Sequence, residues 1–297
     1  MRLILIFLLL FPCSAAPAQE WLLDRAEGVR IHFLKQNEPA LQVLKPVLRQ
    51  ALDRIAAELE SEQLEAVDLY LAPDRQKFHE LTGGRIPDWG AGCAFPARGR
   101  IYIHLEQHDP EALQRTLVHE LAHVALFRRA GGARLPRWFD EGLSMWLARE
   151  WQHRQSLDLA VATLAGQVHS LSQLETLLEF PESQARRAYA ESFSAVLFLQ
   201  KIGGRGIWGE LLEEVERSGS FEQALPEVLG LSSAEFDEAW VLHVQREFNP
   251  LRLMLNSGLL WLGIIGLAVL AYVFTRLRGR RLERAWEEEE KAQDLLE

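Results

Sequence analysis

A run of 23 residues without a formal charge, between Arg252 and Arg276, is the feature that most constrains the fold of this 297-residue chain. A helix of that length spans about 34 Å, which is enough to cross the hydrocarbon core of a bilayer. Trp261 and Tyr272 lie toward its two ends, where aromatic rings favour the membrane interface. We therefore predict a transmembrane helix over residues 253–275.

The residues after this run set its orientation. Five arginines follow it, and clustered basic residues mark the cytoplasmic side of a span: Arg276, Arg278, Arg280, Arg281 and Arg284. Residues 276–297 are therefore expected to form a cytoplasmic tail, with Glu287–Glu290 on a short charged helix.

The N-terminus has the order of a secretory signal. A basic residue precedes the apolar run 3–11, and the small residues Ala16 and Ala18 fit the pattern of a cleavage site. We predict that residues 1–18 are a cleaved signal peptide. An uncleaved anchor is disfavoured because nine apolar residues are too few to span a bilayer. Lipid attachment at Cys13 is disfavoured because bulky residues precede it.

Together the two apolar segments predict a type I membrane protein. Its body, residues 19–250, would lie outside the cytoplasm, and the absence of any Asn-x-Ser/Thr acceptor fits the periplasmic side of a bacterial inner membrane. The body retains one cysteine, Cys93, so an intrachain disulfide is excluded. The sequence does not indicate an oligomeric state.

Composition narrows the class of partner. The chain is 48% hydrophobic and 25% charged, as expected of a folded protein. Its 32 basic and 42 acidic residues give a net charge of −10, and the body carries no basic stripe. An acidic body repels phosphate backbones, which argues against binding to nucleic acid.

The hydrophobic periodicity of the body changes at about residue 108. Before it, strands are expected over 29–34, 66–71 and 100–105, with helices over 39–60 and 74–81, and a loop between. After it, every predicted element is helical: 109–129, 136–151, 157–180, 185–202, 207–217 and 232–248. The pattern predicts an α+β fold, with an α/β lobe over 19–108 that holds a small mixed sheet, and a helical lobe over 109–250.

The first of the later helices contains His119-Glu120-Leu121-Ala122-His123. Residues four apart share a helical face, so both imidazoles can bind one metal ion, and Glu120 can reach a metal-bound water as a general base. The residues around the motif are apolar, namely Leu117, Val118, Leu121, Val124 and Ala125. Three ionisable groups on a buried helix require partners or a function.

A catalytic zinc needs a third protein ligand and an open position. The candidate is Glu141, with 17 residues between it and His123, an interval that suits a turn at Gly131–Gly132 and a returning helix. Gly142 removes bulk beside it. Asp140 is the competing acid, although it would point about 100° away on the same helix.

These residues resemble the gluzincin group of zinc metallopeptidases, in particular the peptidase MA-like domains, over about residues 29–205. Trp138-Phe139-Asp140-Glu141-Gly142 is similar to their W-x-x-E-G segment, whose glutamate binds zinc. The resemblance implies a zincin-like fold and one Zn²⁺ on His119, His123 and Glu141. It also implies hydrolysis of a peptide substrate by metal-activated water, with Glu120 as the base.

The same resemblance extends to two flanking segments. Gly92–Pro96 followed by Arg100–Ile103 is similar to the glycine-containing loop and the edge strand that binds substrate by strand addition. Ala188–Phe193 is similar to the segment that stabilises the oxyanion, a catalytic role that would fall on Tyr189; a ring that merely packs on its helix is the alternative.

One position departs from the family pattern. Some gluzincins place an aspartate four residues after the third ligand, where it orients a histidine, and this chain has Met145. The acceptor for that histidine is therefore unassigned, with Ser144 or a backbone carbonyl as candidates.

Other readings remain open. One alternative is a catalytically silent zincin-fold module for binding or assembly, and another is a purely structural zinc. His104 and His108 share a four-residue interval, but they straddle a strand end, which disfavours a metal site. Cys93 either modulates the zinc or is a small buried side chain.

Overall fold

The computed structural model describes residues 20–247, apart from 63, 65, 85, 87–89, 107, 108, 151–158 and 164, and also residues 259–294. The predicted signal peptide lies outside the described residues. So do His108 and residues 253–258, which open the predicted transmembrane run.

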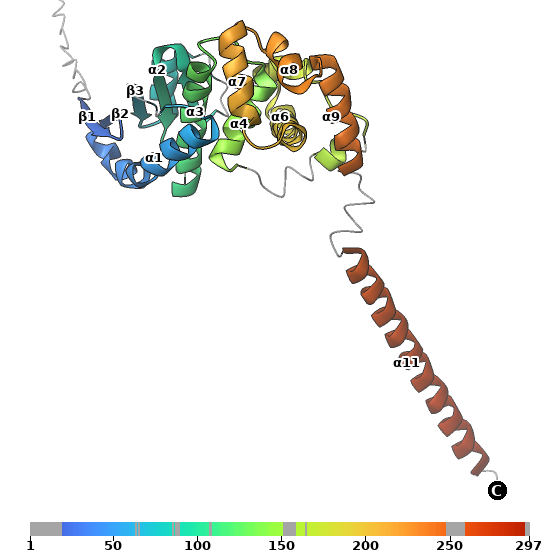
Figure 1. Cartoon of the computed structure of the whole chain (residues 1–297). Helices are drawn as coiled ribbons and strands as arrows, with labels where there is room; N and C mark the ends of the chain where they lie inside the picture. The colour runs from blue at the N-terminus through green and yellow to red at the C-terminus, as the bar shows by residue number, and fades with distance from the viewer. Residues whose placement is uncertain are drawn as a thin grey trace, which may run out of the picture.

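A five-stranded mixed sheet forms the N-terminal part of the body (Figure 1). Its strands lie in the order β1-β2-β3-β5-β4, and their bounds are Trp21–Ala26 (β1), Val29–Leu34 (β2), Val67–Ala72 (β3), Gly92–Phe95 (β4) and Arg100–His104 (β5). The three inner strands are parallel, whereas β1 and β4 pair antiparallel at the two edges. Helix α1 (Glu38–Glu58) makes the crossover between the parallel strands β2 and β3.

One face of this sheet joins the main hydrophobic core. Alternate residues such as Ile31, Leu69 and Ile101 are fully buried there, in one cluster with side chains of α1 and α3 (Pro110–Arg129). On the other face, Tyr70 stacks between His32 and Tyr102, with ring centroids 4.3 and 5.0 Å apart. Helix α2 (Arg75–Thr82) covers part of that second face through Phe78.

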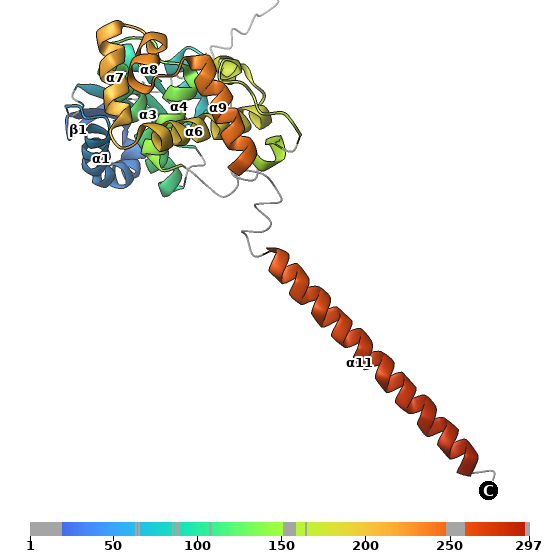
Figure 2. The ribbon, with the colours of Figure 1, turned by 45° about the vertical axis from the view of Figure 1, so that its right-hand side comes forward.

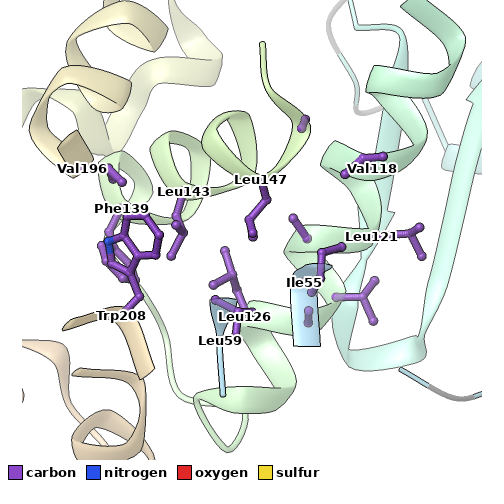
Figure 3. Close-up of a cluster of buried hydrophobic side chains, with 14 of the residues drawn as sticks. Ile55, Leu59, Val118, Leu121, Leu126, Phe139, Leu143, Leu147, Val196 and Trp208 are labelled. Atoms are coloured by element: carbon purple, nitrogen blue, oxygen red, sulfur yellow. The ribbon is translucent and has the colours of Figure 1, made fainter. Parts of the chain in front are cut away.

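The rest of the body is helical and packs around α4. After α3 come α4 (Arg137–Ala148), the 3-10 helix η3 (Gln173–Glu179), α6 (Glu182–Gly203), α7 (Ile207–Ser218), α8 (Phe221–Leu229) and α9 (Ser233–Glu247). Figure 3 shows Leu143 and Leu147 of α4 in the same cluster as Leu126 of α3 and Trp208 of α7. This shared core joins the helices to the α1 side of the sheet.

The structure confirms the α+β class and the helices that were expected to begin near residues 74 and 109. The Asp74 carboxylate accepts a hydrogen bond from the Lys77 amide at 2.7 Å, and Asp109 accepts one from the Ala112 amide at 2.8 Å. Both aspartates therefore satisfy an amide that the first turn leaves without a partner.

The expected position of the edge strand is wrong. Arg100–Ile103 belongs to β5, which lies between β3 and β4, and the edge is formed by Gly92–Phe95, which was expected to be a loop. This four-residue strand is defined by pairing, from Gly92 with Ile103 to Phe95 with Arg100. The sequence pattern also missed β1 and α8.

The expected helix over 157–180 is not continuous: among its described residues, 159–163 are helical and Gln173–Glu179 form a 3-10 helix, but the chain between these two parts leaves the helical path. Gly166 adopts φ +62°, which ends a turn, and residues 167–170 have no regular structure before η3. That segment is tied to α6 instead, because the backbone amide and Nδ1 of His169 both contact the buried Glu191 carboxylate.

Residues 259–294 form one helix, α11 (Leu259–Asp294), drawn as a continuous rod in Figure 2. Trp261–Gly279 is long and apolar enough to cross a membrane, and none of that stretch is buried. The helix continues into the expected cytoplasmic tail as far as Asp294.

Candidate metal centre

The turn between α3 and α4 brings the two helices side by side. Gly131 and Gly132 adopt φ of +61° and +81°, and the Gly132 amide donates to the Phe127 carbonyl at 2.9 Å, so the chain reverses within a few residues. Helix α4 then returns against α3, as the interval between His123 and Glu141 predicted.

This packing brings His119, His123 and Glu141 together, with one potential ligand atom of each within 4.8 Å of the others. The Nε2 atoms of His119 and His123 lie 3.3 and 3.6 Å from the same oxygen, Glu141 Oε2. That oxygen is buried and has no hydrogen-bond partner among the described residues. A buried carboxylate oxygen that faces two imidazole nitrogens fits the His-His-Glu donor set of a catalytic zinc site.

The other ring nitrogen of each histidine faces a carboxylate. His123 Nδ1 lies 2.9 Å from Asp140 Oδ1 and 3.2 Å from the Ser144 hydroxyl. His119 Nδ1 lies 3.3 Å from Glu150 Oε1, at ion-pair distance but without hydrogen-bond alignment. These contacts orient both Nε2 atoms toward Glu141, as the outer shell of a metal site does.

The contact between Asp140 and His123 shows that this acid does not point away from the site, although the helical spacing predicted that it would. It also supplies a histidine with the carboxylate acceptor that Met145 cannot provide. Asp140 lies beside the ligands, but it contacts the far nitrogen of His123 and is not part of the three-residue cluster. Glu150 was not singled out in the sequence. It follows Arg149, whose left-handed φ of +56° ends α4 and turns the chain out of its helical periodicity.

The second oxygen of Glu141 is also held. Arg137 Nη1 lies 3.3 Å from Glu141 Oε1, one helical turn along α4. The arginine therefore engages one carboxylate oxygen while the other faces the two imidazoles. This division favours a Glu141 carboxylate that would bind a metal through Oε2 alone.

The electrostatics of the cluster favour a cation. Burial opposes charge on His123, yet Asp140 and Glu141 raise its pKa to about 10. Burial would raise the pKa of Glu141, but His123 and His119 hold it well below its usual range. Acidic groups outnumber the two imidazoles here, so positive charge at their centre is favoured.

The Glu120 side chain projects from α3 and lies against the edge strand β4. It is buried, and burial raises its pKa to about 7 despite the two histidines nearby. A Cβ placed on Gly92 would lie 2.7 Å from Glu120 Oε1, so only glycine lets β4 approach this carboxylate so closely. A group with a pKa near neutrality, next to an exposed strand edge, suits proton transfer.

Tyr189 comes from α6, which crosses α4 at very close range. A Cβ on Gly142 would lie 2.4 Å from the Ser192 carbonyl oxygen, so the glycine makes room for the α6 backbone rather than for a ligand. Burial, and then the charge of Glu141, raise the pKa of Tyr189 well above its usual value. Its half-buried phenol therefore stays protonated. The negative charge that acts on the phenol comes first from the Glu141 carboxylate of this centre.

Two other sequence candidates lie outside the three-residue cluster found among the described residues, and His108, the partner considered for His104, is not described. His104 is buried in β5 and packs edge-to-face on Phe78 at 5.5 Å. Cys93 lies half-buried in β4, and burial raises the pKa of its thiol to about 12, which disfavours the thiolate that a metal needs. These observations favour a packing role for Cys93.

The sheet, the crossing helices and this His-His-Glu cluster define the architecture of a zincin-type peptidase. Comparison with known families agrees: residues 47–246, more than half of the chain, match the Peptidase MA superfamily, and the chain belongs to it. It is also 26% identical over 133 residues to the uncharacterized protein YhcO of Bacillus subtilis (strain 168). That alignment covers 42% of this chain and only 39% of that protein.

Proposed function

We propose that this chain is a membrane-anchored zinc metallopeptidase. The observation that carries the proposal is the buried Oε2 of Glu141, which has no hydrogen-bond partner among the described residues and faces the Nε2 atoms of both histidines. Membership of the Peptidase MA superfamily supports the same reading. His119, His123 and Glu141 would hold one Zn²⁺, which supplies a Lewis acid for the scissile carbonyl and lowers the pKa of a water.

The chain's own residues would carry the proton and the charge. Glu120, with a pKa near 7, accepts a proton from the attacking water and passes it to the leaving amine. Tyr189, which stays protonated, donates a hydrogen bond to the developing oxyanion. The outer edge of β4 pairs with the peptide backbone, because Gly92 places that strand directly against Glu120.

The proposed setting follows from the two apolar segments. Residues 1–18 would be removed as a signal peptide, and residues 19–250 would act outside the cytoplasm of a bacterial cell. Residues 253–275 would cross the inner membrane and leave 276–297 in the cytoplasm. The apolar stretch of α11 supports anchoring, because none of its 19 residues is buried in the body.

The test uses full-length protein in detergent, with zinc measured per chain and cleavage measured on a library of peptides. Wild type should contain one zinc and cleave; Glu120→Gln should keep the zinc and lose cleavage; Glu141→Ala should lose most of the zinc. Turnover by Glu120→Gln would refute the assigned base. Zinc without cleavage by wild type would favour the silent binding module, and folded protein without zinc would refute the site.

A further inference from the structure

A hollow of about 300 Å³ opens beside the metal centre. It is lined by His123 and Asp140 from the centre itself, by Arg137, and by Pro96, the residue that follows β4. A peptide that pairs with the β4 edge and continues past Phe95 would enter this hollow, because Pro96 forms its wall.

A second hollow of about 590 Å³, here called the distal groove, adjoins the first. Arg134, Leu135 and Glu175 line both, so the two share a wall. Arg134 Nη2 lies 3.4 Å from Glu175 Oε2 at this junction, and the arginine side chain is 87% exposed. A pair this exposed contributes little stability and can separate to admit a chain.

The base of the distal groove is aromatic and aliphatic. Trp138, Phe221, Phe236 and Leu225 lie beneath the groove, and they are almost fully buried in the core: Trp138 stacks on Phe236 at 5.4 Å and meets Phe221 edge-to-face at 5.8 Å. The apolar surface that stays accessible in the groove comes from Leu135, Pro136 and Ala234. Such a surface on a rigid base favours an apolar side chain.

The rim of the groove is acidic. Glu222 and Asp237 stand there with Glu175, against the single cation Arg134. Asp237 accepts from the Leu171 amide and Glu222 from the Ser233 hydroxyl, and these bonds use one oxygen of each carboxylate. The rim therefore complements a basic residue beside the apolar one.

We propose that the distal groove binds a segment of the polypeptide substrate that lies beyond the residues flanking the scissile bond, and that this segment carries an apolar residue next to a lysine or arginine. The inference rests on the proposed peptidase function. It assigns a substrate class to that function. The substrates would be extended polypeptides that carry an apolar residue next to a basic residue, at a distance from the scissile bond.

The test separates binding from cleavage. Fluorescein-labelled dodecapeptides of Gly and Ser, each with one Phe-Lys pair at a different position, are titrated into full-length, zinc-loaded Glu120→Gln protein in detergent. The dissociation constant is read by fluorescence anisotropy. Peptides with the pair toward one end should bind tightest, and replacement of that Phe by Ala should weaken binding at least tenfold, the size of one apolar side chain in a fitted pocket.

Ala234→Trp is the matching change in the protein. Ala234 is exposed in the first turn of α9 and lines the groove, so tryptophan fills the space without entering the core. It should weaken the best peptide about tenfold and abolish the difference between Phe and Ala peptides. Leu242→Trp, at an exposed position of the same helix, should leave binding unchanged. Wild-type residues at the rim should favour a peptide with Lys over the same peptide with Gln in place of Lys. The double variant Glu222→Gln/Asp237→Asn should bind these two peptides equally well.

The outcomes distinguish this inference from the function on which it rests. Equal binding of Phe-Lys and Ala-Lys peptides, or an Ala234→Trp variant that binds like its parent, overturns the groove assignment even if wild type cleaves peptides. Selective binding that Ala234→Trp abolishes supports the groove, and if wild type then cleaves nothing, the peptidase proposal fails alone.

Discussion

The Asp140 carboxylate accepts a hydrogen bond from His123 Nδ1 across 2.9 Å, because an ionised carboxylate can only accept. When a metal is bound and the imidazole is neutral, that bond would keep its proton on Nδ1 and leave the Nε2 lone pair free for an ion between Nε2 and Glu141 Oε2. Asp140 is thus a positioning residue for a proposed metal ligand.

Asp140→Ala should lower zinc affinity about 10–100-fold, the usual cost of removing an outer-shell partner. Zinc dissociation constants from competition with a chelator measure the effect. Ser144→Ala is the matched control, because its hydroxyl lies farther from the same nitrogen, at 3.2 Å, and its loss should matter less. Equal affinities for Asp140→Ala and wild type would contradict the role of Asp140.

Arg137→Gln should also weaken zinc binding, by about tenfold, because Glu141 Oε1 loses its partner and the carboxylate can reorient. Arg137→Lys should restore part of the affinity, since it keeps the charge without the planar fork. The same chelator competition reads the change, with the melting temperature of the metal-free protein as control. A fall in melting temperature with unchanged zinc affinity would make Arg137 merely structural.

Gly142→Ala should destabilise the body by about 1–3 kcal/mol or more, because the new methyl group meets the α6 backbone at 2.4 Å. Denaturant unfolding of the zinc-free protein measures this directly. Gly263→Ala in α11 is the control, since nothing lies within 4 Å of its added Cβ. Equal midpoints for the two variants would show that α4 and α6 separate without cost.

Cys93 should react with iodoacetamide about a thousandfold more slowly than a free thiol at pH 8, because burial raises its pKa to about 12 and leaves little thiolate. Mass spectrometry of the proteolytic peptide that contains Cys93, followed over time, gives the rate. Alkylation should become fast in denaturant, which serves as the control. Rapid reaction of the folded protein would refute the shifted pKa.

Asp68 should link stability to acid. The Arg30 guanidinium, at 2.6 Å, holds the pKa of Asp68 well below its usual range, with help from His32. Because the folded pKa lies below the unfolded one, this stabilisation is full above about pH 4 and is lost as the pH falls through the folded value. Asp68→Asn should cost about 0.5–1 kcal/mol at pH 7 and progressively less as the pH is lowered below about 4, by denaturant unfolding. A cost independent of pH would contradict the ion pair.

Local spacing explains what could be predicted from the sequence. His119, Glu120 and His123 follow from one helical repeat, and Asp74 and Asp109 cap helices whose starts depend on nearby residues alone. The class of fold follows from the same periodicities.

What could not be predicted depends on contacts between distant residues. The four residues of β4 include a glycine and become a strand only through pairing with β5. Glu150 reaches His119 only because Arg149 takes a left-handed turn after α4. Asp140 lies one residue before the third ligand, and its contact with His123 requires the observed crossing of the two helices.

The three candidate ligands, and the acids Asp140 and Glu150 that contact the histidines, lie on α3, on α4 or just after α4. The chain entropy needed to close a loop grows only slowly with its length, and this loop is short. An ion held here would therefore cross-link two neighbouring helices, and it would stabilise them against unfolding as a ligand bound only to the folded state, whether or not a substrate is ever cleaved.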